Sequence, residues 1–366
     1  MKIIWLNHRD PQHPDAGGAE VHLREVGKRL VRNGCDITLI SERFPGSQAE
    51  EMIDGIHVIR RGGRIGVHIK APLLVTKLAK NADIVVDDIA HAVPWWSSLV
   101  TRLPVVAMVH HIHQCVATLE LGYPVGTAVK LAERTIKSTY DSIITVSQDT
   151  KRQIERQLKV EGSKIHVVYH GVDHETFHPN GEKFSQPTLL SLGRIKKYKN
   201  IQDLLHAFAL AKKRVPDLRL IICGRGDFRD HIVDVSKNLN LQDVQFLDAT
   251  KDEARVKLLQ RSWVLCTPSL FEGWGMVVTE AAACGTPALA YEGGVSSEAI
   301  VDGETGYFVK TGDIQAFSER IVTLAQDDKM RRSMSRAAIE HSNKFDWDTT
   351  ANETLRILET SATNSV

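Results

Sequence analysis

Cysteine is scarce in this sequence and is not arranged for metal binding or disulfide pairing. The 366 residues include five cysteines, none of them in a CxxC pattern. An odd, widely spaced set argues against a disulfide framework and fits a reducing compartment. No apolar run approaches the roughly 18 residues that a membrane-spanning helix needs, and the segment Met1–Asp10 turns polar too early for a signal peptide. We therefore expect a soluble, cytoplasmic protein.

The chain also lacks an excess of charge of either sign. It carries 46 Lys and Arg against 45 Asp and Glu, which gives no electrostatic reason to expect a nucleic-acid partner. Hydrophobic residues make up 42% and charged residues 25%, which are the proportions of a globular protein. Because one hydrophobic core rarely organises so long a chain, the length predicts two domains.

Short runs rich in β-branched residues alternate with helix-length segments. Strands separated in this way predict βαβ units and parallel sheets covered by helices. The expected strands are Lys2–Leu6, Asp36–Ile40, Ile84–Asp87, Val105–Val109, Ser142–Val146, Thr188–Leu192, Leu218–Cys223, Trp263–Thr267 and Pro287–Ala290. The sequence therefore predicts an α/β protein with two Rossmann-like domains facing across a cleft.

The segment from His178 to Pro187 divides these strands into two series. It holds two prolines, an asparagine and a glycine, which interrupt regular structure. We therefore expect an N-terminal domain over residues 1–178 and a C-terminal domain over residues 187–348.

A glycine-containing loop follows the first strand of each domain. Gly17 and Gly18, after Asp15, come just before the first helix, where backbone N–H groups can meet an anion or a sugar hydroxyl. In the second domain, Gly193 ends a strand, and Arg194 and Lys199 flank a loop that suits a diphosphate. An ordinary turn and a solvated basic loop are the alternatives. Neither GxGxxG nor GxxxxGK[ST] occurs.

Two glutamates eight residues apart mark the most informative segment, Pro268 to Pro287. Gly273 and Gly275 keep Glu272 in a loop, whereas Glu280 lies within a stretch of good helix formers. A loop glutamate can accept hydrogen bonds from sugar hydroxyls, and one two turns further can reach a ribose. A pair of surface glutamates is the alternative, but Glu280 sits among apolar residues and would be costly to bury without partners.

These motifs resemble, in order, those of retaining glycosyltransferases with the GT-B fold, specifically glycosyltransferase family four. The resemblance covers nearly the whole chain. It rests on Gly17 to Glu20, Tyr169 to Asp173, Gly193–Arg194 with Lys199, Phe271 to Pro287, Gly293 to Glu298, Asp302 to Gly306 and Phe345 to Trp347. Two departures are Asn200 and Asp248, which stand where the family often has glycine. In the family, the last helix, here 349–366, crosses back to the N-terminal domain.

The resemblance implies a role for each motif. Glu272 would bind the hydroxyls of the donor sugar, Glu280 the ribose, and Arg194 and Lys199 the diphosphate. His110, directly after the strand Val105–Val109, matches a family histidine that contacts the donor sugar or its phosphate. The catalytic residues would be His110, Glu272, Arg194 and Lys199. The donor site would comprise Gly17, Gly18, Gly193, Arg194, Lys199, Gly224, Glu272, Gly273, Trp274, Gly275, Glu280 and Glu298.

The pattern HHxHxC, from His110 to Cys115, also suggests a metal site. Adjacent residues of an extended segment point to opposite sides, so His110 and His111 are poorly placed to share an ion. We therefore expect no metal and no other cofactor. His111 and His113 are assigned to the acceptor side or to packing, and Trp95 and Trp96 either to stacking on an acceptor sugar or to the core.

Residues 60–80 carry six cations and no acid, interleaved with aliphatic residues. Such a segment can lie on an anionic membrane surface, and a lipid-linked acceptor would then follow. The alternative is a solvated loop followed by a helix that faces the core.

The sequence thus predicts a metal-independent, retaining transferase that moves a hexose of glucose or mannose type from a nucleotide sugar to a glycan or lipid-linked acceptor. A nucleotide-sugar epimerase of the same fold is the first alternative. A nicotinamide dehydrogenase fits the sequence less well, because the glycine fingerprint of such enzymes is missing. The third alternative is a protein that binds a sugar nucleotide without catalysing a reaction.

Overall fold

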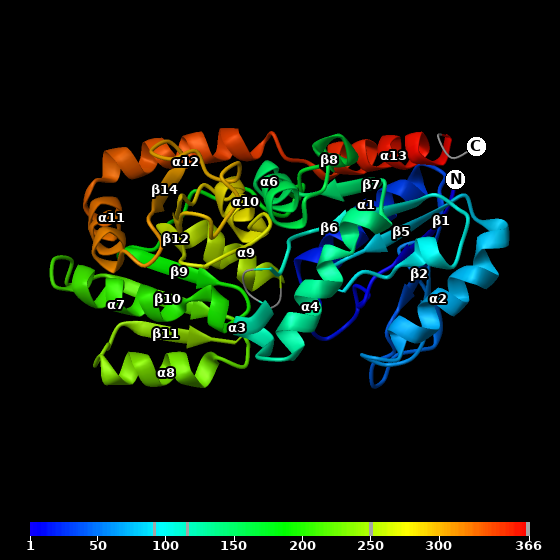
Figure 1. The fold of residues 1–366 in the computed structure, drawn as a ribbon. Helices are drawn as coiled ribbons and strands as arrows, with labels where there is room; N and C mark the ends of the chain where they lie inside the picture. Colours follow the sequence, from blue (N-terminus) through cyan, green and yellow to red (C-terminus); the bar gives the residue numbers. More distant parts are fainter. Residues whose placement is uncertain (91–92, 115–116, 249–251, 364–366) are drawn as a thin grey trace. The chain divides into compact units, whose positions relative to one another are not determined.

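The structure is a computed structural model that describes residues 1–90, 93–114, 117–248 and 252–363. The chain divides into two compact units (Figure 1). Unit 1 consists of Met1–Gly171 and Trp347–Val366, and unit 2 of Val172–Asp346. Residues 172–187 therefore group with the second unit, and the end of the chain returns to the first.

Unit 1 is built on an eight-stranded sheet in the order β3-β4-β2-β1-β5-β6-β7-β8. All neighbouring strands are parallel except β3 and β4. The strands are β1 (Lys2–Leu6), β2 (Asp36–Ser41), β3 (Glu50–Ile53), β4 (Ile56–Arg60), β5 (Ile84–Asp88), β6 (Val105–Val109), β7 (Ser142–Thr145) and β8 (Ile165–Val167). Because the order reverses between β1 and β5, the carboxyl ends of these strands mark the expected ligand-binding edge.

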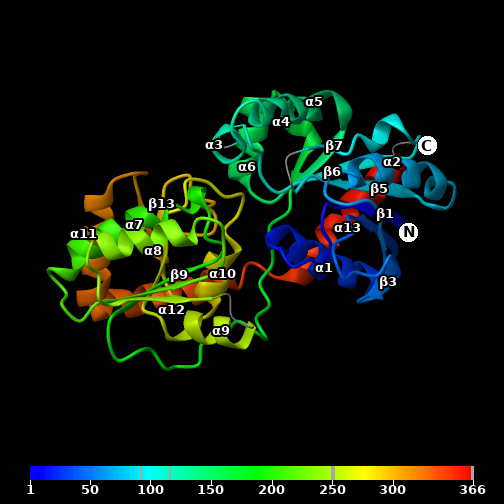
Figure 2. The same cartoon turned by 90° about the horizontal axis from the view of Figure 1, so that it is seen from below.

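The α-helices of unit 1 range from four to seventeen residues in length. They are α1 (Gly18–Arg32), α2 (Val67–Leu78), α3 (Ala117–Leu121), α4 (Val125–Arg134), α5 (Ile136–Thr139), α6 (Gln148–Gln153) and α13 (Trp347–Thr363). In α1, Leu23, Val26 and Leu30 are buried at helical spacing. Helix α13 lies beside α1 (Figure 2), and Arg29 Nε contacts Asp348 Oδ1 at 2.6 Å.

Unit 2 contains a six-stranded, fully parallel sheet in the order β11-β10-β9-β12-β13-β14. Counted within the unit, this is the 3-2-1-4-5-6 order of a dinucleotide-binding fold. The strands are β9 (Thr188–Leu192), β10 (Arg219–Cys223), β11 (Val244–Leu247), β12 (Val264–Thr267), β13 (Ala288–Tyr291) and β14 (Gly306–Val309). The helices are α7 (Ile201–Lys212), α8 (Arg229–Asn238), α9 (Asp252–Arg261), α10 (Met276–Ala283), α11 (Ile314–Gln326) and α12 (Asp328–Ser342).

The predicted fold class is confirmed, and each of the nine predicted strands occurs within one or two residues of its expected bounds. The switch point of unit 2 lies between β9 and β12, which are paired neighbours. The loops that leave their carboxyl ends are those that carry Arg194 and Glu272. The topology alone therefore brings the two most informative sequence motifs to one edge.

Candidate active site

The loop after β9 is held close to the loop after β10 by glycine. Gly193 and Gly224 have φ of 138° and 156°, and a Cβ at Gly224 would lie 1.8 Å from the carbonyl oxygen of Gly193. A side chain cannot be accommodated at Gly224 at such a distance, whereas Gly193 is favoured by its positive φ alone. The loop then leads to α7 through Asn200, whose φ is 51°. Asparagine tolerates this left-handed conformation, so the departure from glycine preserves the loop.

The cations of this loop differ in their surroundings. Arg194 is exposed, and its side chain forms no ion pair or hydrogen bond with the residues that the structure describes. Lys199 is largely buried, and its Nζ lies 2.7 Å from Glu272 Oε1. Burial lowers the pKa of Lys199, but the attraction of Glu272 outweighs it, and the pKa of Lys199 is raised above its ordinary value. Lys199 therefore stays cationic at the edge of the switch point.

Glu272 accepts two hydrogen bonds within unit 2, and both fall on the same oxygen. Its Oε1 binds Lys199 Nζ and, at 2.8 Å, Ser269 Oγ. Its Oε2 has no partner among the described residues. The carboxylate is thus oriented through one oxygen, and the other can accept a hydrogen bond from a ligand.

Glu280 lies in α10 and is 5% exposed. It pairs with Arg255 of α9, which the sequence analysis did not identify. Burial raises the pKa of Glu280, and Arg255 opposes this shift. The structure therefore places a buried ion pair where a ribose-binding carboxylate was predicted, with Arg255 compensating the buried charge.

The remaining donor-side residues mostly support the loops. Trp274 is 2% exposed and packs edge-on against Phe345, with ring centroids 4.9 Å apart. The indole is therefore buried within unit 2, and a role for Trp274 in donor binding stays a prediction. Gly275 has φ of 95° and precedes α10. The carboxylate of Glu298 accepts a hydrogen bond from Ser296 Oγ, two residues earlier.

In unit 1, His110 directly follows β6 and belongs to a buried cluster of three histidines. Its Nε2 lies 3.1 Å from Asp88 Oδ1, and its ring stacks on His170 at 5.5 Å between centroids. His22 of α1 completes the cluster, with its Nδ1 2.9 Å from that of His170. Asp88, His22 and His170 were not predicted, because the fold brings them together from distant parts of the chain.

Because this cluster is buried, we predict that the protein becomes less stable in mild acid. Burial, followed by the neighbouring histidines, holds the pKa values of His22 and His170 well below the ordinary value. The unfolded chain therefore binds more protons below about pH 6.5, and each histidine removes about 1.4 kcal/mol from the free energy of unfolding per pH unit there. Denaturant unfolding of the wild type and of His22→Gln between pH 5 and 8 measures this, and the variant is expected to have the shallower slope.

The difference between the two proteins isolates the histidine contribution. Burial raises the pKa of Asp87 to about 6, so Asp87 acts in the opposite direction, stabilising the folded state as the pH falls through about 6 to 4. Asp87 is present in both proteins and cancels in the comparison. Equal slopes for the two proteins would contradict the expected role of His22.

In the glycine loop after β1, one backbone N–H group is already hydrogen-bonded to a side chain of α1. The N–H of Gly17 donates to Glu20 Oε2 at 2.6 Å, and Gly18 opens α1. The preceding loop is anchored by Asp10, whose carboxylate receives Arg60 Nε at 2.6 Å in a fully buried pair. Of the two glycines assigned to the donor site, Gly17 therefore acts in helix capping.

The residues assigned to the acceptor have different environments. Trp95 is 3% exposed and stacks on His68 at 4.5 Å, so it belongs to the core of unit 1, the second of the two roles considered for it. Trp96 is partly exposed, and its Nε1 donates to Thr135 Oγ1 at 2.8 Å. His111 and His113 contact each other through their Nε2 atoms at 2.9 Å.

The metal interpretation of HHxHxC includes Cys115, which lies outside the described residues. Within the part of the chain that is described, no three His, Cys, Asp or Glu side chains are grouped to hold an ion. His113 Nδ1 instead lies 3.1 Å from Glu133 Oε1.

The basic segment 60–80 begins with a buried arginine and continues into α2, which has one buried face and one exposed face. Arg60 has no exposed surface and pairs with Asp10 and Glu51, so it cannot contribute to a basic surface. Val67, Ala71 and Val75 are the buried residues of α2. Ile65, Ile69 and Leu73 are 80%, 67% and 60% exposed. None of the helices in the described residues is long and apolar enough to cross a membrane.

Two parallel-sheet units with these switch-point motifs have the architecture of GT-B glycosyltransferases. A model of glycosyl transferases group 1 matches residues 173–341, and a model of glycosyltransferase family 4 matches residues 16–176. Together the two models span residues 16–341, so the predicted resemblance is confirmed and the chain is a glycosyltransferase of group 1.

Relatives and solved structures agree over almost the full length. The D-inositol 3-phosphate glycosyltransferase of Corynebacterium diphtheriae is 27% identical, with 95% of this chain and 92% of the relative covered. Sucrose-phosphate synthase from Thermosynechococcus elongatus has a TM-score of 0.84 at 20% identity, covering 98% of both chains. Anabaena HepE, solved in complex with UDP-glucose, has a TM-score of 0.77 at 20% identity and covers 98% of this chain and all of its own.

Proposed function

We propose that this glycosyltransferase moves a hexose, of glucose or mannose type, from a nucleoside diphosphate sugar to a glycan or lipid-linked acceptor, with retention of the anomeric configuration and without a metal. The observation that carries the donor assignment is the group formed by Arg194, Lys199 and Glu272 at the switch point of unit 2. Unit 2 would hold the donor and unit 1 the acceptor.

The chemistry follows from where charge develops. Breaking the anomeric C–O bond leaves positive charge on the sugar and negative charge on the departing diphosphate. Arg194 and Lys199 would stabilise the diphosphate, since preorganised cations act most strongly on charge that builds in the transition state. Glu272 Oε2 would accept a hydrogen bond from a sugar hydroxyl and fix the orientation of the ring. His110, oriented by Asp88, would contact the transferred sugar or its phosphate.

The cellular setting is part of the proposal. We infer a cytoplasmic enzyme that touches an anionic membrane surface through residues 60–80. Support comes from the exposed aliphatic residues Ile65, Ile69 and Leu73, which alternate with Lys70 and Lys77.

Acceptor-dependent release of nucleoside diphosphate tests the reaction. The protein is incubated with UDP- and GDP-hexoses and with candidate glycan and lipid-linked acceptors, with and without EDTA. We expect release that the acceptor accelerates and that EDTA does not change, and a product whose anomeric configuration, read by NMR, equals that of the donor. Conversion of the donor sugar without acceptor would instead identify an epimerase, and inverted product would exclude retention.

A further inference from the structure

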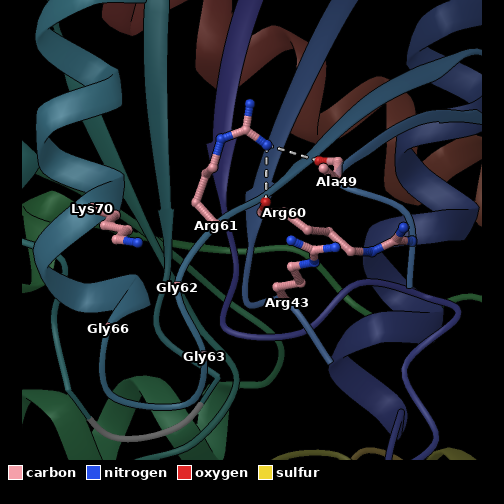
Figure 3. A pocket seen from close by; sticks show the side chains of 8 residues that line it. All are labelled: Arg43, Ala49, Arg60, Arg61, Gly62, Gly63, Gly66 and Lys70. Atoms are coloured by element: carbon pink, nitrogen blue, oxygen red, sulfur yellow. Dashed lines mark hydrogen bonds between the residues drawn. The ribbon is translucent and has the colours of Figure 1, made fainter. Parts of the chain in front are cut away.

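A pocket of about 550 Å³ lies in unit 1, outside the residues assigned above to catalysis. Its walls include Arg43, Arg61, Lys70 and three glycines of the loop between β4 and α2, namely Gly62, Gly63 and Gly66 (Figure 3). The described residues that line it include no acid. The lining is therefore strongly cationic although the whole chain is almost neutral.

The pocket lies at the ligand-binding edge of the unit 1 sheet. β2 and β4 are parallel neighbours, with Ser41 paired to Arg60 at their carboxyl ends. Arg43 follows the first of these strands and Arg61 the second. The glycine loop after β1 and His110 after β6 leave the same edge.

A chain of contacts leads from α2, the helix that supplies Lys70 to the pocket, to His110. His68, in the first turn of α2, stacks on Trp95, and Trp95 Nε1 donates to the carbonyl oxygen of Asp88 at 2.9 Å. The carboxylate of Asp88 in turn holds His110. Helix α2 and the histidine cluster are thus connected through packed side chains.

Four cations line the pocket, and two of them, Arg60 and Arg61, already have acidic partners. Arg60 pairs with Asp10 and Glu51, and Arg61 pairs with Glu50. The side chains of Arg43 and Lys70 form no ion pair or hydrogen bond with described residues. In Figure 3, Lys70 reaches in from α2 and Arg43 from the segment after β2, with the glycine loop between them. An anion entering this space would meet two cations without displacing a native partner.

The glycine loop folds tightly onto the start of α2. Gly62 has φ of 72°, and a Cβ there would lie 2.5 Å from the carbonyl carbon of Gly66. The first N–H groups of α2 donate to carbonyl oxygens of this loop. The side chains of Arg43 and Lys70 are therefore the groups that the pocket offers to an anion.

We propose that this pocket binds a phosphate ester carried by the acceptor, with Arg43 and Lys70 as the two cations that hold it. The proposal rests on the proposed function and narrows its acceptor to a phosphorylated one. A free sugar phosphate and a lipid headgroup offer the same chemistry. The exposed Ile65 and Ile69 beside the pocket would accommodate the lipid form.

Binding is measured with saturating UDP present, so that the diphosphate loop of unit 2 is filled. In the soluble arm, calorimetry follows inositol monophosphate, with inositol as the unphosphorylated control. In the vesicle arm, phosphatidylcholine vesicles contain either phosphatidic acid or phosphatidylserine at equal surface charge. A pocket for a phosphate ester prefers phosphatidic acid, whereas a merely basic surface does not distinguish the two lipids.

The variants Arg43→Ala and Lys70→Ala are expected to weaken phosphate binding about fivefold each and about 25-fold together, since each removes one charge-assisted contact at an exposed site. Lys137→Ala is the control, because Lys137 is an exposed cation of unit 1 outside both the pocket and residues 60–80. Phosphate-selective binding in either arm, lost in the double variant, supports the proposal and identifies the source.

Absence of phosphate-selective binding in both arms, or its retention in the double variant, would overturn the proposal. Separate titrations with UDP alone and with GDP alone report on unit 2. If neither nucleotide binds while phosphate binding is intact, the proposed donor site is refuted and the proposal for this pocket is not, so the two failures are distinguishable.

Discussion

Replacing Glu272 with glutamine is expected to lower kcat/KM for transfer by roughly 10²-fold, the effect typical of losing one preorganised polar contact at a reacting centre. The amide keeps the shape of the side chain but removes the charge that holds Lys199 at 2.7 Å. An NH₂ group in the place of Oε2 also cannot accept the hydrogen bond that a sugar hydroxyl would donate to Oε2. Steady-state kinetics with a nucleotide hexose and its acceptor measure the loss.

Deoxygenated donors separate a direct contact from an effect through Lys199. If Glu272 binds one hydroxyl, the donor that lacks this hydroxyl should lose activity with the wild type and little further with Glu272→Gln, as in a double-mutant cycle. Glu304→Gln, an exposed glutamate of the same unit, is the control and should keep full activity. Unchanged kcat/KM in Glu272→Gln would remove this carboxylate from the site.

Replacing Arg194 with alanine is expected to weaken the binding of nucleoside diphosphate by about tenfold to a hundredfold, because a bidentate charge-assisted contact is lost. Arg194 is exposed and has no partner for its side chain among the described residues. The substitution should therefore leave the melting temperature unchanged, which separates binding from folding. Calorimetric titration with UDP and with GDP measures the affinity.

Lys213→Ala provides the comparison for Arg194→Ala. Lys213 is an exposed cation at the far end of α7, the helix that follows the diphosphate loop. It shares the general charge of the unit but not the position at the switch point. Equal losses in the two variants would indicate a non-specific electrostatic effect and would contradict a diphosphate site at Arg194.

The central strands of both sheets could be predicted from the sequence because they are buried on both faces. Runs such as Lys2–Leu6 and Thr188–Leu192 are almost continuously apolar, as parallel strands require. Five strands were not predicted, namely β3, β4, β8, β11 and β14, and four of them are the edge strands of the two sheets. β3 begins with two glutamates and lies at a sheet edge, and β8 has three residues. Their strand conformation depends on the neighbour with which they pair, and single-sequence patterns do not contain that neighbour.

The parts of the candidate site that could be predicted are those formed by residues close together in the sequence. Glycines, cations and glutamates in the loops after β9 and β12 indicated a site before any strand order was known. Arg255 and His22 were not predictable, since their roles arise from contacts across 25 and 148 residues of sequence, with Glu280 and His170 respectively. Arg60 shows the opposite error, because composition cannot distinguish a cation on the surface from one buried against Asp10.

The chain enters and leaves unit 2 at neighbouring residues. Val172 and Asp346, the first and last residues of unit 2, form a β-bridge with each other. On the unit 1 side, the ring of His170 lies 5.9 Å from that of Trp347. Unit 2 is therefore a domain inserted into unit 1, with its two ends side by side. A short linker between Gly171 and Trp347 would close unit 1 without it, and residues 172–346 form an uninterrupted segment that can be exchanged as a module.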